Sequence, residues 1–290
     1  MQWSRSLTAA ACVALTAAWA CSKPEAPEAD PVDPGVVAAY GQFVETRRTR
    51  PIDFQALTGL YQTRLAPYIR RAADRFGCDL DPAIRAALEQ GREGRNPAVV
   101  AQIADKTIQR AFILTFTQSL KRLRETVEDD ESLRLVREAE PVIRSTADRR
   151  SQWAGKGSEY PDLLDRIMGR LVAGAGRRNI EAVAEAGAQL ESLVTKVLVL
   201  SVFYELYGLE KAREWDEDKA GEKRIEAQIY HLDLTGAHLE RNREGAHIVA
   251  DQLAGPTDWV DIDLVRKLLK TDFSEEISDV DPTILGLAAQ

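Results

Sequence analysis

The sequence predicts an all-α fold, a multi-helix bundle, and three observations support this prediction. No run of alternating apolar and polar residues is long enough for a strand, and no Asn-Gly or Asp-Gly pair separates β-branched stretches. Many segments carry the Pro, Asn and Gly residues that begin and end helices. Two stretches, residues 111–116 and 197–203, are apolar on nearly every side, so other helices must enclose them.

The expected helices follow from apolar periodicity and from their terminal signals. Pro82 and Pro97 stand at first helical positions, and Gly77, Gly91 and Gly255 fall where helices should end. The expected helices cover residues 35–46, 53–76, 81–90, 96–127, 131–153, 161–174, 179–207, 209–253 with a break near Gly221, and 258–270.

Composition excludes several classes of protein. The chain has 290 residues and a formal net charge of −8, with 46 acidic against 38 basic residues, so its surface should repel nucleic acid. Three His and three Cys leave little material for zinc clusters or a disulfide framework. Mixed charge runs at residues 121–140 and 210–226 are typical of solvated helix faces.

The first 20 residues predict a signal peptide. One positive charge, Arg5, precedes an uncharged run over residues 7–20, which is too short for a comfortable membrane span of roughly 20 residues. The run ends in Ala18-Trp19-Ala20-Cys21, which resembles the lipobox of bacterial lipoproteins. The resemblance implies acylation of Cys21, and Ser22 after it implies the outer membrane of a Gram-negative cell. Cleavage by the ordinary signal peptidase, giving a soluble secreted protein, is the alternative.

The organisation that follows is a tether and one helical domain. Residues 21–35 are rich in Pro and acids, a composition that stays extended and solvated and holds a domain away from a membrane. We expect an α-helical domain over residues 36–275, in halves 36–150 and 160–275, and a C-terminal tail over residues 276–290. Cys78 is then the one remaining thiol, and a lone Cys of this kind is usually buried and inert.

A spaced pattern occurs twice in the domain. Ile84, Leu88, Gly91 and Asn96 recur as Ile167, Leu171, Gly174 and Asn179, at a constant offset of 83 residues. Each pattern precedes a long apolar helix. The repeat suggests a duplicated helical hairpin, although a generic sequence of short helix, Gly turn and buried helix gives the same pattern.

The helix at residues 209–253 carries a polar stripe beside its apolar side: Gln228, His231, Thr235, His238 and Asn242. Similar polar positions occur at Gln102, Lys106 and Gln109, and at Gln189, Ser192 and Lys196. Such groups need hydrogen-bond partners when buried, so they form either a buried network or a ligand-binding cleft. The two His lie roughly 10 Å apart along the helix axis, which argues against a shared metal ion.

A second cluster on this helix combines acids with the third His: Glu240, Glu244, His247 and Asp251. Glu244 and His247 have the Glu-x-x-His spacing of di-iron carboxylate bundles. Those bundles need a second such element, which the sequence lacks. The cluster is therefore either a candidate metal site or a solvent-facing acidic patch.

No catalytic motif identifies an enzyme, since nucleophile elbows, phosphate-binding Gly loops, Cys-x-x-Cys pairs and His-Glu-x-x-His are missing. We expect a bacterial cell-envelope lipoprotein, facing the periplasm or the exterior, whose domain is a non-enzymatic binding or scaffold module without a cofactor. Its partner would be an envelope protein or the cell wall. The alternative is a periplasmic bundle that binds a metal ion, haem or a small ligand at the His-bearing helix.

Overall fold

Helices build the described part of the chain, residues 35–287, in this computed structural model, and no strand occurs among these residues. The first helices are α2 (Val36–Arg48), α3 (Phe54–Leu60), α4 (Ala66–Phe76) and α5 (Asp81–Arg92), with a π-helical turn at Tyr61–Leu65. The longer ones are α6 (Pro97–Glu125), α7 (Asp130–Trp153), α8 (Glu159–Gly176), α9 (Ile180–Ala212) and α10 (Glu217–Arg241). Last come α11 (Arg243–Ala254), a 3-10 turn at Thr257–Trp259 and α12 (Ile262–Asp272). The all-α prediction is confirmed.

Asx side chains fix the start of most helices. Each accepts a hydrogen bond from the backbone N–H three residues later, a contact worth about 1 kcal/mol. These residues are Asp53, Asn96, Asp129, Asn179, Asp216, Asn242 and Asp261. The predicted helix starts at residues 53, 96 and 179 are confirmed by these caps.

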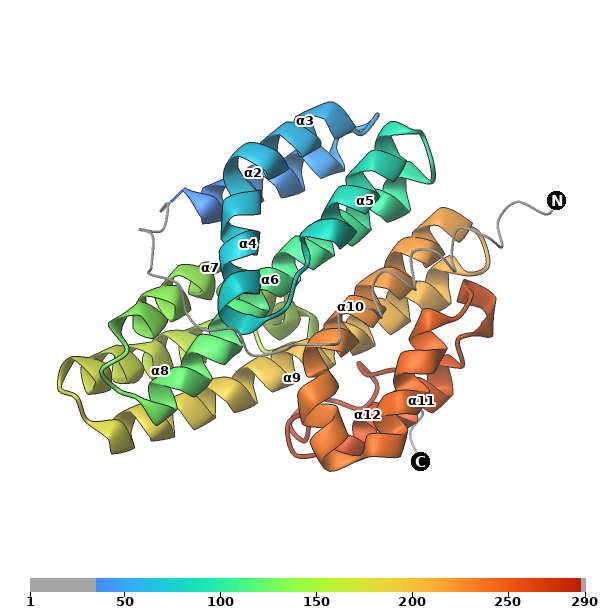
Figure 1. The fold of residues 1–290 in the computed structure, drawn as a ribbon. Coiled ribbons are helices and arrows are strands. Elements are labelled where there is room, and N and C mark those ends of the chain that lie inside the picture. Colours follow the sequence, from blue (N-terminus) through green and yellow to red (C-terminus); the bar gives the residue numbers. More distant parts are fainter. Residues whose placement is uncertain (1–34, 288–290) are drawn as a thin grey trace.

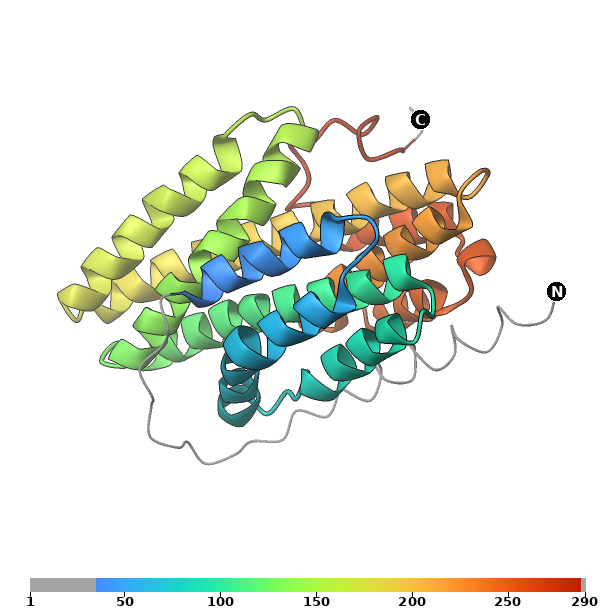
Figure 2. The same ribbon diagram turned by 90° about the horizontal axis from the view of Figure 1, so that it is seen from above.

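The long helices α6, α9 and α10 pack against one another at the centre of the bundle (Figure 1). Helices α7 and α8 extend this layer, and α2 to α5 lie over α6 and α7, as the view from above shows (Figure 2). The predicted halves, residues 36–150 and 160–275, therefore share one core. A buried ion pair between Arg110 of α6 and Asp233 of α10, 3.1 Å long, also joins them.

The two apolar stretches are central, as predicted. Every residue over positions 197–203 of α9 is buried, and over positions 111–116 of α6 all are buried except Leu114. By length and composition α9 is the one described helix that could cross a membrane, but 67% of its most apolar window is buried inside the bundle. The neighbouring helices account for its hydrophobicity.

The prediction of one helix over residues 209–253 with a break near Gly221 is wrong. The chain breaks after Ala212 and again at Asn242, and Gly221 lies inside α10. A Cβ at Gly221 would meet Val99 Cγ2 at 3.1 Å, so the glycine brings α10 close to α6. Asn242 has an extended backbone, with φ of −151°, and its side chain caps α11. The capping signal of Asn was overlooked at that position.

The two similar patterns both form helical hairpins. Asn96 caps α6 after α5, and Asn179 caps α9 after α8, at matching positions. Their backbones differ, because Asn96 has a left-handed φ of 37° and Asn179 a φ of −90°. Duplication of the hairpin stays a prediction. At the C-terminal end, Ile277, Val280 and Leu285 are buried in the core, so the described part of the predicted tail packs on the bundle.

Replacing Gly91 by Ala should destabilise the protein by roughly 1–3 kcal/mol, because a Cβ there would overlap the ring of Phe54. The matched control is Gly59→Ala, where a Cβ meets nothing within 4 Å and should stabilise α3 by about 0.5–1 kcal/mol. Urea unfolding midpoints measure both effects. Equal midpoints for Gly91→Ala and the unsubstituted protein would show that Gly91 of α5 does not lie against Phe54 of α3.

Candidate functional site

A cleft of about 800 Å³ opens between α2, α6, α7, α9 and α10. Small-molecule sites in proteins commonly measure about 300–1,000 Å³. Thirteen charged side chains line this cleft, eight basic and five acidic. Six of these side chains are buried and two are half-buried. Since buried charges are rare unless they are paired, their gathering at one cleft makes it the candidate functional site.

Helical spacing brings the polar side chains of α6 and α10 to the same side of the bundle. Gln102, Lys106 and Gln109 follow one another at steps of four and three residues, which places them on one face of α6. Lys223, Glu226 and Tyr230 are spaced by three and four residues, which places them on one face of α10. Because α6 and α10 pack side by side, these two faces meet.

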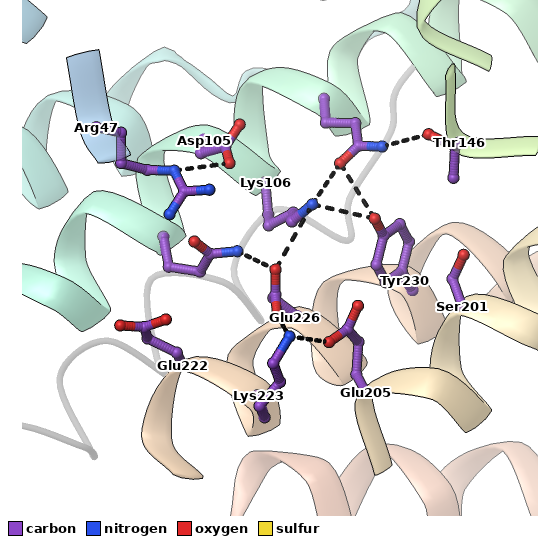
Figure 3. Close-up of polar contacts among 12 residues, drawn as sticks. Arg47, Asp105, Lys106, Thr146, Ser201, Glu205, Glu222, Lys223, Glu226 and Tyr230 are labelled. Carbon is purple, nitrogen blue, oxygen red and sulfur yellow. Dashed lines mark hydrogen bonds and ion pairs between the residues drawn. The ribbon is translucent and has the colours of Figure 1, made fainter. Parts of the chain in front are cut away.

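Five buried or half-buried side chains form what we call the central ion cluster: Lys106, Arg150, Glu205, Lys223 and Glu226. Figure 3 shows Lys106, Glu205, Lys223 and Glu226. The ammonium of Lys223 donates to Glu205 Oε2 and to Glu226 Oε2, each at 2.6 Å. The ammonium of Lys106 lies 3.7 Å from Glu226 Oε1. Two carboxylates thus share three cations at the meeting point of four helices.

Neutral side chains complete the hydrogen bonding of the cluster. Lys106 Nζ donates to Gln109 Oε1 at 2.9 Å and to the hydroxyl of Tyr230 at 3.1 Å. Gln102 Nε2 donates to Glu226 Oε1. Gln109 Nε2 donates to Thr146 Oγ1 at 2.8 Å, which ties the cluster to α7. The geometry is fixed from several helices at once.

Arg150 connects α7 to α9. Its Nη2 lies 3.2 Å from Glu205 Oε1, and its Nε donates to Ser201 Oγ at 3.0 Å. Its guanidinium carbon also lies 4.0 Å from the ring centroid of Tyr204. Planar guanidinium groups stack on aromatic rings in this way while their N–H groups bind carboxylates.

Helix α2 covers one side of the cleft and is held there by Asp105 of α6. Arg47 Nε lies 2.9 Å from Asp105 Oδ2, and the hydroxyl of Tyr40 donates to Asp105 Oδ1 at 2.8 Å. Asp105 is 1% exposed, so both contacts lie in the interior. An ion pair of this kind positions α2 over α6.

The two carboxylates of the cluster have opposite pKa shifts. Burial, and then the nearby charge of Glu226, raise the pKa of Glu205 to about 7. Burial opposes ionisation of Glu226 as well, but Lys106 and Lys223 outweigh it and lower that pKa to about 2. Glu226 is therefore an anion at neutral pH, whereas Glu205 binds a proton near neutrality.

The predicted ligand-binding residues of the His-bearing helix lie outside this cleft. His231 and His238 are both buried, and Thr235 Oγ1 donates to the carbonyl of His231 at 3.0 Å. Gln228 is buried and accepts a bond from Arg224 at 3.3 Å. Asn242 caps α11 and donates to Asp272 at 3.1 Å. The structure brings His231, His238, Asn242 and Asp272 together, whereas Gln228 bonds to Arg224.

The imidazole rings of His231 and His238 touch, although their backbones are far apart along the helix axis. His231 Nε2 and His238 Nδ1 lie 3.0 Å apart, and His238 Nε2 lies 2.8 Å from Asp272 Oδ2. The side chains lean toward each other along the helix, so their rings meet although the rise per residue separates their backbones by roughly 10 Å. Burial, and then the charge of His238, lower the pKa of His231 to about 3, so His231 is neutral.

The predicted metal-binding residues are all exposed. Glu240 belongs to α10, and Glu244, His247 and Asp251 belong to α11, beyond the break at Asn242. Across residues 35–287, no group of three or more His, Cys, Asp and Glu side chains is arranged to hold a metal ion. The prediction that these four residues lie on one face assumed that they belong to one continuous helix. The predicted lipidation site, Cys21, lies outside the described residues.

Sequence reasoning found part of the cleft and missed the rest. It singled out Gln102, Lys106 and Gln109 as polar positions, but it did not identify the side chains to which they bond. Glu222 and Glu226 belong to a run interpreted as a solvated face, and both are buried. The available signal was their spacing on the same face as Tyr230. Of the other noted positions, Lys196 binds Asp279 at 2.6 Å, and Gln189 accepts a bond from Arg170.

Comparison of the chain with protein-family models, with curated proteins and with solved structures found no match.

Glu205→Gln should change the pH dependence of stability. A folded-state pKa of about 7, above the usual 4.5, means that proton binding by Glu205 stabilises the fold fully below pH 4.5 and that this stabilisation is lost as pH rises through 7. Relative to the Gln variant, the unsubstituted protein should therefore lose stability between pH 5 and pH 8. Urea unfolding across that range measures this. The control is the exposed Glu214→Gln, and parallel curves for Glu205→Gln would contradict the assignment.

Proposed function

We propose that this protein is a cell-envelope lipoprotein whose helical domain is a non-enzymatic module that binds a small ligand in the cleft. The signal peptide over residues 1–20, the acylated Cys21 and the tether over residues 21–35 are proposed from the sequence, and they lie outside the described residues apart from Gly35. The resemblance to a lipobox supports this location in the cell envelope. The cleft supports the binding role.

The observation that carries the binding role is the central ion cluster beside the cleft. Removing an ion from water costs several kcal/mol, and a well-packed apolar core of similar volume is often as stable or more stable. A bundle of this size could close the space between α6, α7 and α10 with Leu and Ile. The charged lining of the cleft instead favours a function that needs charge, namely recognition of a polar ligand.

The same cluster favours binding over catalysis. All four carboxylate oxygens of Glu205 and Glu226 engage neighbours: Arg150 and Lys223 for Glu205, Gln102 and Lys223 for Glu226. A general base or nucleophile needs a free oxygen within reach of its substrate. These carboxylates instead hold the cations in fixed positions, and a preformed site loses little entropy on binding.

The His-bearing helix offers less support for a second function. Both ring nitrogens of His238 are engaged, one with His231 and one with Asp272. Metal or haem ligation at His238 would have to break one of these buried contacts. The cleft is therefore the better candidate for the ligand.

Cys21→Ala should release the protein from membranes, because the lipid would no longer be attached. The measurement is the distribution of the protein between the sedimented envelope and the soluble fraction of its cells. Cys78→Ala is the matched control, since that thiol is buried in the fold, and it should leave the protein in the sediment. Continued sedimentation of the Cys21→Ala protein would contradict the lipid anchor.

Gly41→Trp should block the cleft without disturbing the fold. Gly41 lines the cleft on α2, and a Cβ there meets nothing within 4 Å. The control is Gly169→Trp on α8, which also has open space and lies outside the cleft. In equilibrium dialysis against a small-molecule extract of the producing cells, followed by mass spectrometry, the unsubstituted protein and the control should retain a compound that Gly41→Trp does not. Equal retention by all three proteins would contradict the proposed function.

A further inference from the structure

We infer that the cleft binds a small anion that carries two or more negative charges, an inference that rests on the binding function proposed above. The chain as a whole is acidic, with a net charge of −8. The cleft departs from that balance, because eight basic and five acidic side chains line it, a surplus of three positive charges. A cleft of one sign, walled by protein, concentrates ions of the opposite sign.

Part of the lining charge is neutralised in separate ion pairs. Three basic side chains each have one acidic partner within 3 Å: Arg47 with Asp105, Arg48 with Glu45, and Lys219 with Glu222. These pairs add no net charge. The surplus must therefore come from the remaining lining residues.

One surplus charge lies in the central ion cluster. Its three cations, Lys106, Arg150 and Lys223, share only the two carboxylates Glu205 and Glu226. Lys106 is 6% exposed and Arg150 4% exposed, so little water screens them. Charge interactions are several times stronger in such surroundings than in bulk water.

The other two surplus charges are Arg50 and Arg149. Within residues 35–287, Arg149 makes no hydrogen bond or ion pair, although it lines the cleft directly before Arg150 on α7. Arg50 donates to the backbone carbonyls of Arg47 and Thr49 and pairs with no acidic side chain among the same residues. A guanidinium with free N–H groups binds carboxylate or phosphate oxygens through two parallel hydrogen bonds.

Aromatic side chains add a surface for the carbon part of such an anion. Tyr40, Trp153 and Tyr204 line the cleft, and the rings of Trp153 and Tyr204 pack edge to face with centroids 5.5 Å apart. Small-molecule sites usually combine such apolar area with a few placed polar groups. An organic anion bearing carboxylate or phosphate groups fits both parts of the lining.

The test is isothermal titration of the purified protein with pyrophosphate and with citrate, at low ionic strength. Both anions should bind at one site, while acetate at matched ionic strength and the dication putrescine should not. Arg149→Gln should weaken binding about tenfold, the usual cost of a lost charge-assisted hydrogen bond. The matched control, Arg166→Gln on the exposed face of α8, should bind within about twofold of the unsubstituted protein. Circular dichroism checks that each variant folds.

Two results would overturn the inference. The first is that neither pyrophosphate nor citrate binds. The second is that they bind Arg149→Gln as tightly as the Arg166→Gln control, which would place the anion away from the cleft. Either result removes the anion assignment. Arg149 is exposed and makes no hydrogen bond or ion pair with the described residues, so unfolding of this variant is not expected.

Gly41→Trp separates this inference from the binding function. If putrescine or a neutral sugar such as trehalose binds the unsubstituted protein and Gly41→Trp prevents it, the cleft is a binding site but not one for anions. If no probe of any charge binds in a manner that Gly41→Trp prevents, and the dialysis experiment also shows equal retention, both proposals fail.

Discussion

The fold depends on one electrostatic constraint: two carboxylates must neutralise three cations where α6, α7, α9 and α10 meet. Lys223 lies between Glu205 and Glu226, 2.6 Å from an oxygen of each, and Lys106 and Arg150 approach the same carboxylates from the other helices. Truncating one member of a buried pair commonly costs about 3–5 kcal/mol, because the charge left behind stays buried. The cluster therefore fixes how the four helices meet.

This constraint also explains why a cleft exists in an otherwise well-packed bundle. Charged side chains cannot be enclosed by apolar ones without a large desolvation cost, so the space in front of the cluster stays accessible to solvent. Helix α2 partly covers it and is held by the contacts of Arg47 and Tyr40 with the buried Asp105. The apolar stretches of α6 and α9 continue beyond the cluster and supply the core that carries it.

The fold class followed from the sequence because helix formation leaves local signals. Asn96 and Asn179 mark helix starts within a few residues, and the apolar stretch at residues 197–203 predicts a buried helix without any knowledge of its neighbours. The site did not follow in the same way. Whether Glu226 lies in solvent or beside Lys223 and Gln102 depends on how α10 packs against α6, and that packing depends on contacts more than 100 residues apart in sequence. Because the capping role of Asn242 was overlooked, Glu240 and His247 were assigned to one helix, whereas they belong to α10 and α11.

The most direct test of the account is a crystal structure of the protein soaked with selenate, a divalent anion whose selenium is located by anomalous scattering. The account predicts a selenium peak inside the cleft, with selenate oxygens at hydrogen-bond distance, about 2.7–3.1 Å, from the guanidinium of Arg149. It also predicts that Lys223 bridges Glu205 and Glu226 in that structure. A cleft without selenate while the anion occupies other surface sites, or Glu226 turned out into solvent, would contradict it.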